Sequence, residues 1–187
     1  MFWITLFDHD ELYLRNPLRG VFQSPAKILA ELGVRQGFRI LDAGAGFGYL
    51  SLQAARMVGS SGVVYAVEPD SCRAAVLRAR ARYAGLDWVV VVNRPLELFG
   101  EESAQPVDRA VMFMSLHHMT EPTRALRVVH SKLKADGVFL VVEPRRNSVF
   151  RHGSEPRTLH GLLVKAGFRV VGHRVSPFSL KFVAEKE

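Results

Sequence analysis

ILDAGAGFGYLS, residues Ile40–Ser51, joins an apolar run to a glycine-rich turn and the start of a helix-like segment. Gly44, Gly46 and Gly48 alternate with other residues in this turn. Glycines at this spacing allow a strand to turn sharply and let a ligand approach the bare backbone. The helix that follows directs free backbone N–H groups at the same place. The stretch therefore predicts a nucleotide-type ligand site between a strand and a helix.

The turn departs from the dinucleotide-binding pattern GxGxxG, because its third glycine, Gly48, comes one residue early and Tyr49 follows it. Asp42 precedes the first glycine by two residues, and a carboxylate there would repel a bound pyrophosphate. Both features argue against a dehydrogenase. The acid suits a ligand with a cationic end, such as S-adenosylmethionine, which has an ammonium, a sulfonium and an adenosine but no phosphate. On this motif alone, a tight turn without a ligand is the alternative.

A second apolar run, Val63–Val67, ends at Glu68, twenty residues after Gly48. In nucleotide-binding α/β folds, an acid at the end of the second strand accepts hydrogen bonds from the ribose hydroxyls. A solvated carboxylate at a strand end is the plainer alternative. Asp42 and Glu68 at paired strand ends favour the ligand site, because coincidence explains two such acids less well than one.

Four segments in this order resemble the class I S-adenosylmethionine-dependent methyltransferases, and most of all the small proteins near the ubiquinone/menaquinone C-methyltransferases. They are LDAGAGFG (41–48), VEPD (67–70), VDRAVMFMSLHHM (107–119) and LKADGVFLVVEP (133–144). The resemblance runs from about Pro25 to the C-terminus. It implies a doubly wound, Rossmann-like α/β sheet of seven mostly parallel strands, with an antiparallel last strand and helices on both faces. The motifs are specific for the cofactor class and not for the substrate.

The resemblance implies S-adenosylmethionine as the cofactor and places its site on the motif residues. The residues implied are Asp42, Gly44, Ala45, Gly46, Gly48, Glu68, Pro69, Asn93, Arg94, Phe113 and Met114. In the family, a polar residue after the third strand, often Asp, bonds the adenine amine. Asn93 is the best match here, and an amide can accept this bond through its carbonyl. A turn residue at the strand end is the alternative for Asn93.

Methyl transfer from a sulfonium is an SN2 displacement, for which a protein mainly aligns the reactants and excludes water. A base is needed only if the acceptor must lose a proton. His117 and His118 follow the predicted fourth strand, at the sheet edge that carries the chemistry of open α/β folds. They are candidates for a general base or an orienting donor, with a helix cap and a packed residue as the alternative. No metal site is predicted, because adjacent residues rarely chelate one ion and no third ligand is evident.

The acceptor site is expected where an N-terminal segment and the loops after the fourth and fifth strands meet, as is common in the family. The candidates are Tyr13, Arg19, Phe22, Glu143 and Arg145. Residues 1–23 are predicted to form an arm or lid over a methyltransferase domain that spans residues 24–187. A loosely docked terminus is the alternative for the arm, and a solvated basic loop is the alternative for the arginines near Arg145.

The apolar runs and the Gly and Pro breakers predict the element order of the chain. Helices are predicted at 24–32, 48–58, 70–84, 121–133 and 154–165, and strands at 39–42, 63–67, 87–92, 107–114, 138–143, 168–175 and 179–184. Residues 134–137 are predicted to form a turn. Cys72 is predicted to be a small packed residue inside a helix.

The composition places the chain among ordinary intracellular domains. Its 187 residues fit one domain, and its single cysteine excludes a disulfide framework and a cysteine-cluster metal site. The opening MFWITLF is apolar for seven residues without a basic leading region, so neither a signal peptide nor a membrane span is expected. We expect a cytoplasmic monomer or homodimer.

The net charge of +7 favours anionic partners, among them RNA. The arginines are scattered, however, and Arg73, Arg78, Arg80 and Arg82 are predicted to lie on the exposed side of one helix. Three hypotheses therefore stay open: methylation of a small molecule as the main one, methylation of RNA, and a cofactor-binding partner subunit without activity. The chain lacks an Asn/Asp-Pro-Pro-Phe/Tyr sequence after the fourth strand, which argues against methylation of the exocyclic amines of adenine and cytosine or of glutamine amides. No cysteine lies at a strand end, which argues against methylation of cytosine at C5.

Overall fold

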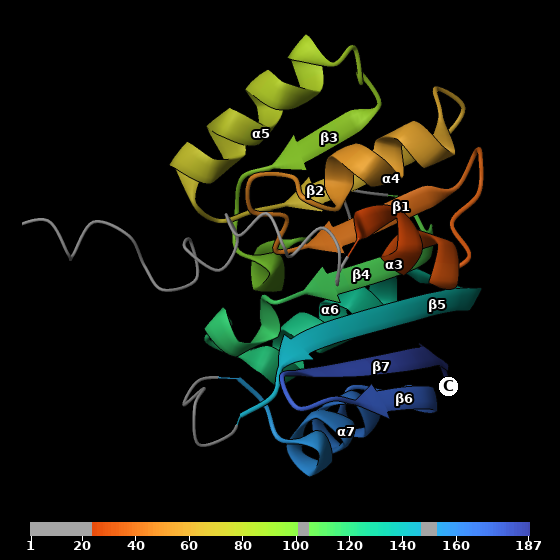
Figure 1. Cartoon of the computed structure of the whole chain (residues 1–187), viewed down its shortest axis with the longest axis vertical. Helices are drawn as coiled ribbons and strands as arrows, with labels where there is room; N and C mark the ends of the chain where they lie inside the picture. The colour runs from red at the N-terminus through yellow and green to blue at the C-terminus, as the bar shows by residue number, and fades with distance from the viewer. Residues whose placement is uncertain (1–23, 101–104, 147–152) are drawn as a thin grey trace, which may run out of the picture.

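The valine-rich runs of the sequence form a seven-stranded sheet in the order β3-β2-β1-β4-β5-β7-β6 (Figure 1). The structure is a computed structural model and describes residues 24–100, 105–146 and 153–187. The strands are β1 Arg39–Ala43, β2 Val63–Val67, β3 Val89–Val92, β4 Val107–Phe113, β5 Leu133–Pro144, β6 Phe168–Val175 and β7 Ser179–Lys186.

Only β7 runs antiparallel to its neighbours β5 and β6, and the other neighbouring strands of the sheet are parallel. The predicted fold class is therefore confirmed. The strand order reverses between β1 and β4, because the chain builds outward from β1 through β2 and β3 before it returns to β4. Ligands of open α/β sheets bind outside the carboxyl ends of the strands at such a reversal. The topology thus marks one edge of the sheet for the site.

Helices cover both faces of the sheet (Figure 1). They are α3 Pro25–Glu31, α4 Ser51–Val58, α5 Ser71–Tyr83, α6 Pro122–Lys132 and α7 Pro156–Lys165, with the short 3-10 helices η1 Leu96–Leu98 and η3 Leu116–His118. One apolar cluster joins α3, α4 and α5 to the sheet, and a second joins α6 and α7 to it. Among the described residues, no helix combines the length and the apolar character that crossing a bilayer requires.

The helix boundaries follow local signals. Asp70 accepts a hydrogen bond from the backbone N–H of Arg73 at 2.8 Å and so caps α5 at its N-terminus. The start of α4 was predicted at residue 48, but the helix begins at Ser51 and residues 46–50 form turns. Gly48 has φ +88°, a left-handed conformation that a right-handed helix cannot include. The glycine turn is therefore longer than predicted.

Two other local predictions are wrong. Residues 134–137 were predicted as a turn, yet they belong to β5, where the register against β4 shifts between the pairs Val107–Leu133 and Arg109–Val138. Pairing of β5 with its neighbours overrides the local turn signal. Cys72 is exposed rather than packed, because α5 buries Ala74 and Leu77 on its opposite side.

Gly48 is a site where any side chain would disturb the packing. A Cβ there would overlap Leu77 of α5, whereas a Cβ at Gly85, which also has positive φ, would meet no atom within 4 Å. We expect Gly85→Ala to lower the free energy of unfolding by about 1 kcal/mol through its backbone alone. Gly48→Ala should cost about 1–3 kcal/mol more, because it also overpacks the core.

Urea unfolding of both variants at equal pH measures this difference. Gly48→Ala should lower the free energy of unfolding by less in a Leu77→Ala background, because the shortened side chain at position 77 leaves room for the new methyl group. Equal costs for Gly48→Ala and Gly85→Ala would contradict the packing at this turn.

Candidate functional site

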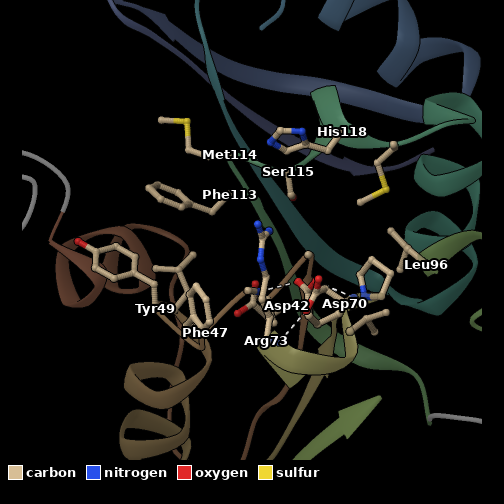
Figure 2. A pocket seen from close by; sticks show the side chains of 18 of the residues that line it. Asp42, Phe47, Tyr49, Asp70, Arg73, Leu96, Phe113, Met114, Ser115 and His118 are labelled. Atoms are coloured by element: carbon tan, nitrogen blue, oxygen red, sulfur yellow. Dashed lines mark hydrogen bonds between the residues drawn. The ribbon is translucent and has the colours of Figure 1, made fainter. Parts of the chain in front are cut away.

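A cleft of about 880 Å³ opens at the carboxyl ends of β1, β2 and β4, where the strand order reverses (Figure 2). Eight of the predicted cofactor residues line it: Asp42, Gly44, Ala45, Gly46, Glu68, Pro69, Phe113 and Met114. The lining does not include Gly48, Asn93 or Arg94. The structure therefore brings eight of the eleven predicted cofactor residues together around one cleft.

The glycine turn forms one wall and leaves its backbone open to a ligand. The N–H groups of Gly44 and Ala45 both donate to the carbonyl of Val67 at 2.9 Å, which ties the turn to the end of β2. A Cβ on Gly44 would overlap Ser115, so this glycine lets the turn approach the loop after β4. At Gly46, by contrast, a Cβ would meet nothing within 4 Å, and the backbone lies bare in the cleft.

Glu68 ends β2 and is only 4% exposed. Its carboxylate accepts the N–H of Gly46 at 2.8 Å and the N–H of Asp70 at 3.0 Å, one on each oxygen. Each oxygen has a second lone pair, so the carboxylate can also accept the hydroxyls of a ribose. The side-chain N–H₂ of Asn93 donates to the carbonyls of Glu68 and Pro69, both at 2.9 Å. Asn93 thus fixes the loop that carries the acid.

Asp42 lies at the end of β1 and is 2% exposed. The Ser51 hydroxyl donates to Oδ2 at 2.5 Å. Burial raises the pKa of Asp42 to about 6 and the nearby charge of Glu68 adds to the rise, while the Ser51 hydrogen bond opposes it. A cationic group bound in the cleft would supply the missing favourable charge. The two acids therefore suit the ammonium of S-adenosylmethionine and oppose a pyrophosphate.

Apolar and aromatic side chains form the rest of the cleft. The rings of Tyr49 and Phe113 stack with their centroids 5.8 Å apart. Figure 2 shows these rings and Phe47 at one end of the cleft, with Leu96 of η1 at the other. An adenine base or an aromatic acceptor could bind between such walls, because stacking and burial of apolar area favour it.

Two arginines of α5 line the cleft: Arg80 is exposed, as predicted, whereas Arg73 was predicted to be exposed and is half-buried. Arg80 donates from Nη1 to the carbonyl of Phe47 at 2.6 Å and so holds the glycine turn against α5. The guanidinium of Arg73 lies 5.8 Å from the Phe47 ring centroid, and its side chain extends into the cleft (Figure 2). Their spacing of seven residues puts them on one helix face, which was the available sequence signal.

The loop after β4 forms the opposite wall. His117 and His118 both line the cleft, and their ring centroids are 4.0 Å apart. Met114 at the start of this loop has φ +53°, a conformation that costs a side-chain-bearing residue about 1–2 kcal/mol. Its N–H donates to the carbonyl of Val142 at 2.7 Å, so pairing with β5 holds the strained backbone in place.

The acceptor candidates are placed differently from one another. Glu143 is fully buried beneath the loop after β4 and does not line the cleft. Arg145 lines a second pocket of about 390 Å³ together with Arg146, Glu155, Pro156 and Arg157. Tyr13, Arg19 and Phe22 lie outside the described residues. In the described ranges, no group of three or more His, Cys, Asp or Glu side chains is arranged to hold a metal ion.

Several lining residues were not predicted from the sequence, among them Phe47, Tyr49, Leu96, Ser115 and Thr120. Phe47 and Tyr49 lie inside the glycine motif, so the motif itself was the signal. Leu96 and Thr120 sit on irregular segments after β3 and β4, for which strand and helix periodicity gives no placement.

Comparison with known proteins gives a consistent result. A family model described as a methyltransferase domain matches residues 18–181. The ubiquinone/menaquinone biosynthesis C-methyltransferase UbiE of Cellvibrio japonicus (strain Ueda107) is 29% identical over 151 residues, which are 81% of this chain and 56% of that protein. The chain spans about half the length of the curated relatives it matches.

Solved structures share the fold. An S-adenosylmethionine-dependent methyltransferase from Aquifex aeolicus aligns with a TM-score of 0.76 and 25% identity, over 95% of this chain and 98% of that one. Magnesium protoporphyrin IX methyltransferase from Synechocystis PCC 6803, with bound S-adenosylmethionine, aligns with a TM-score of 0.73 over 97% of this chain and 85% of its own. At 16% identity, this second likeness shows the fold alone.

Asp42→Asn tests the electrostatics of the cleft in the free protein. The folded-state pKa of about 6 exceeds the ordinary 3.8, so the stability from Asp42 is full below pH 3.8 and is lost as the pH rises through 6. Asparagine does not titrate, so the Asp42→Asn variant does not lose this stability as the pH rises. The free energy of unfolding of the variant, relative to wild type, should therefore be about 1.4 kcal/mol greater at pH 8 than at pH 5.

Urea unfolding at the two pH values measures the difference, and Asp136→Asn, at an exposed carboxyl outside the cleft, is the control. A difference that does not change with pH would contradict the raised pKa of Asp42.

Proposed function

This chain belongs to the methyltransferase domain family of S-adenosylmethionine-dependent methyltransferases, and from that premise we propose that it methylates a small organic molecule. The family membership confirms the resemblance seen in the sequence. The observation that carries the proposal is the pair of buried acids, Asp42 and Glu68, that faces an aromatic-walled cleft across the bare backbone of Gly46.

S-adenosylmethionine supplies, when bound, an electrophilic methyl group on a sulfonium. Glu68 would accept hydrogen bonds from the ribose hydroxyls, and Asp42 would favour the ammonium group. The backbone N–H groups of the glycine turn would approach the ligand closely. Phe47, Tyr49 and Phe113 would cover it and exclude water, which strengthens the electrostatic contacts in the cleft.

A small acceptor is favoured by the dimensions and chemistry of the cleft. Its volume of about 880 Å³ lies in the range of small-molecule sites, and its walls are largely apolar. The curated relatives are named for ubiquinone and menaquinone biosynthesis. We therefore propose a flat aromatic acceptor, with quinols and catechols as the first compounds to try.

RNA is the second candidate acceptor, and a specific feature supports it. Arg145, Arg146 and Arg157 gather in the second pocket, beside the carboxyl end of β5, in a chain of net charge +7. RNA binding by such a surface would weaken steeply with salt, because each neutralised phosphate releases counterions. Absence of RNA binding at low salt would dismiss this candidate.

A turnover assay tests the proposal directly. Transfer of a labelled methyl group from S-adenosylmethionine is measured with a naphthoquinol, a catechol, an aromatic amine, a thiol and bulk RNA. We expect labelled product from at least one small acceptor and none from RNA. Binding of S-adenosylhomocysteine with no turnover on the whole panel would favour the inactive partner subunit.

Glu68→Gln tests the cofactor assignment. Glutamine keeps the shape of the side chain but places an amide against one of the N–H groups that Glu68 accepts, and it has one acceptor oxygen instead of two. We expect its dissociation constant for S-adenosylhomocysteine to rise at least tenfold, by calorimetry. Glu185→Gln, at a half-buried acid of β7 that is paired with Arg169 outside the cleft, is the matched control and should bind as wild type does. Unchanged affinity of Glu68→Gln would refute the assignment.

A further inference from the structure

One buried carboxylate organises the loop after β4. Glu143, at the end of β5, is 0% exposed. Its Oε1 accepts the backbone N–H groups of Ser115 and Leu116, both at 3.0 Å. Its Oε2 accepts the backbone N–H of His117 at 3.1 Å and lies 2.8 Å from Nδ1 of the same residue. Four contacts from one loop thus converge on the two oxygens of Glu143.

This arrangement selects one form of the His117 ring. A carboxylate that already accepts three backbone N–H groups has no hydrogen to offer, so Nδ1 of His117 must be the donor. In a neutral imidazole, a proton on Nδ1 leaves the lone pair on Nε2. A carboxylate in this position also stabilises the imidazolium that forms when Nε2 takes a proton.

The side chain of His117 lies at the wall of the cleft. His117 lines it together with Asp42, Phe113 and Met114, and its side chain is 7% exposed. Its Nε2 is buried, and the ring of His118 lies 4.0 Å away, centroid to centroid. His118 is exposed at the wall of the cleft (Figure 2). A rotation of the His118 side chain is the movement we expect to admit an acceptor to Nε2.

We propose that Nε2 of His117 takes a proton from the methyl acceptor and that Glu143 is the residue that positions it. This inference rests on the proposed function and adds the class of acceptor: a hydroxyl, an N–H or an acidic C–H, rather than a tertiary amine or a thioether. As the acceptor atom bonds to the methyl carbon, the carbon–sulfur bond breaks and its electron pair goes to sulfur. The acceptor's proton passes to Nε2 and then to solvent.

Nitrogen NMR of the ¹⁵N-labelled wild-type protein tests the first step without an acceptor. At about pH 7.5, His117 should show the Nδ1–H tautomer, with a lone pair on Nε2. In Glu143→Gln, the amide oxygen should stay on the N–H groups of Ser115 and Leu116, and the N–H₂ should turn toward Nδ1 of His117, with loss of the bond from the His117 backbone N–H. The ring should then switch to the Nε2–H tautomer, which cannot accept a proton. An Nε2–H tautomer in wild type would overturn the proposal.

Kinetics with two probe acceptors test the second step. A catechol must lose a proton, whereas 4-nitrothiophenol is already ionised at about pH 7.5. Glu143→Gln should lower kcat for the catechol at least a hundredfold and leave kcat for the thiolate within about threefold. Glu185→Gln is the matched control. An equal loss for both acceptors would mean that Glu143 acts only on the structure of the loop, and would overturn the proposal.

Binding of S-adenosylhomocysteine separates this inference from the proposed function. Wild-type protein that binds it but methylates no hydroxyl, N–H or C–H acceptor overturns the acceptor class while the cofactor assignment stands. Protein that does not bind it overturns the proposed function, and the proton transfer with it, whatever the tautomer. His117→Asn, which keeps a donor near Glu143, gives the same kinetic test should Glu143→Gln fail to fold.

Discussion

The hydrogen bond from the Gly46 N–H to the Glu68 carboxylate, 2.8 Å long, is the constraint on which the site depends. It joins the turn after β1 to the end of β2, two elements that the topology places side by side. The N–H of Gly46 reaches the acid from a backbone with φ +54°, a left-handed conformation that glycine adopts readily. The same hydrogen bond fixes the carboxylate that we propose accepts the ribose hydroxyls. The glycine motif thus sets the geometry of the turn, and the turn positions the acid that the ligand would contact.

The buried charges of the described residues at the carboxyl edge of the sheet are negative, although the chain as a whole is basic. The chain carries a net +7, yet the three acids that are buried among the described residues, Asp42, Glu68 and Glu143, all lie at the carboxyl edge of the sheet. Each is held by hydrogen bonds from backbone N–H groups or, for Asp42, from Ser51. Burying acids without cations destabilises a free protein, and the raised pKa of Asp42 expresses that cost. A bound cationic ligand would offset this destabilisation, so the acids that lower the stability of the free protein are the ones that would favour the ligand.

Local patterns predicted β2 to the residue and the two acids of the cleft, because apolar runs and the acids that end them are written in consecutive residues. Local patterns failed where residues far along the chain determine the conformation or the contacts of a segment. The start of β5 depends on its pairing with β4, and the direction of Glu143 depends on the loop after β4. Arg73 looked like a solvated helix residue because its neighbour, the glycine turn, lies more than twenty residues away. Sequence periodicity carries no information on such contacts.

Above all, we propose that the cleft between β1 and β4 takes the adenosyl end of S-adenosylmethionine. Calorimetric titration of the wild-type protein with S-adenosylhomocysteine, with NADH as the comparison, tests it most directly. We predict micromolar binding of the former and none of the latter, because two buried acids accept a ribose and a cation but repel a pyrophosphate. Binding of NADH alone, or of neither ligand, would contradict the account.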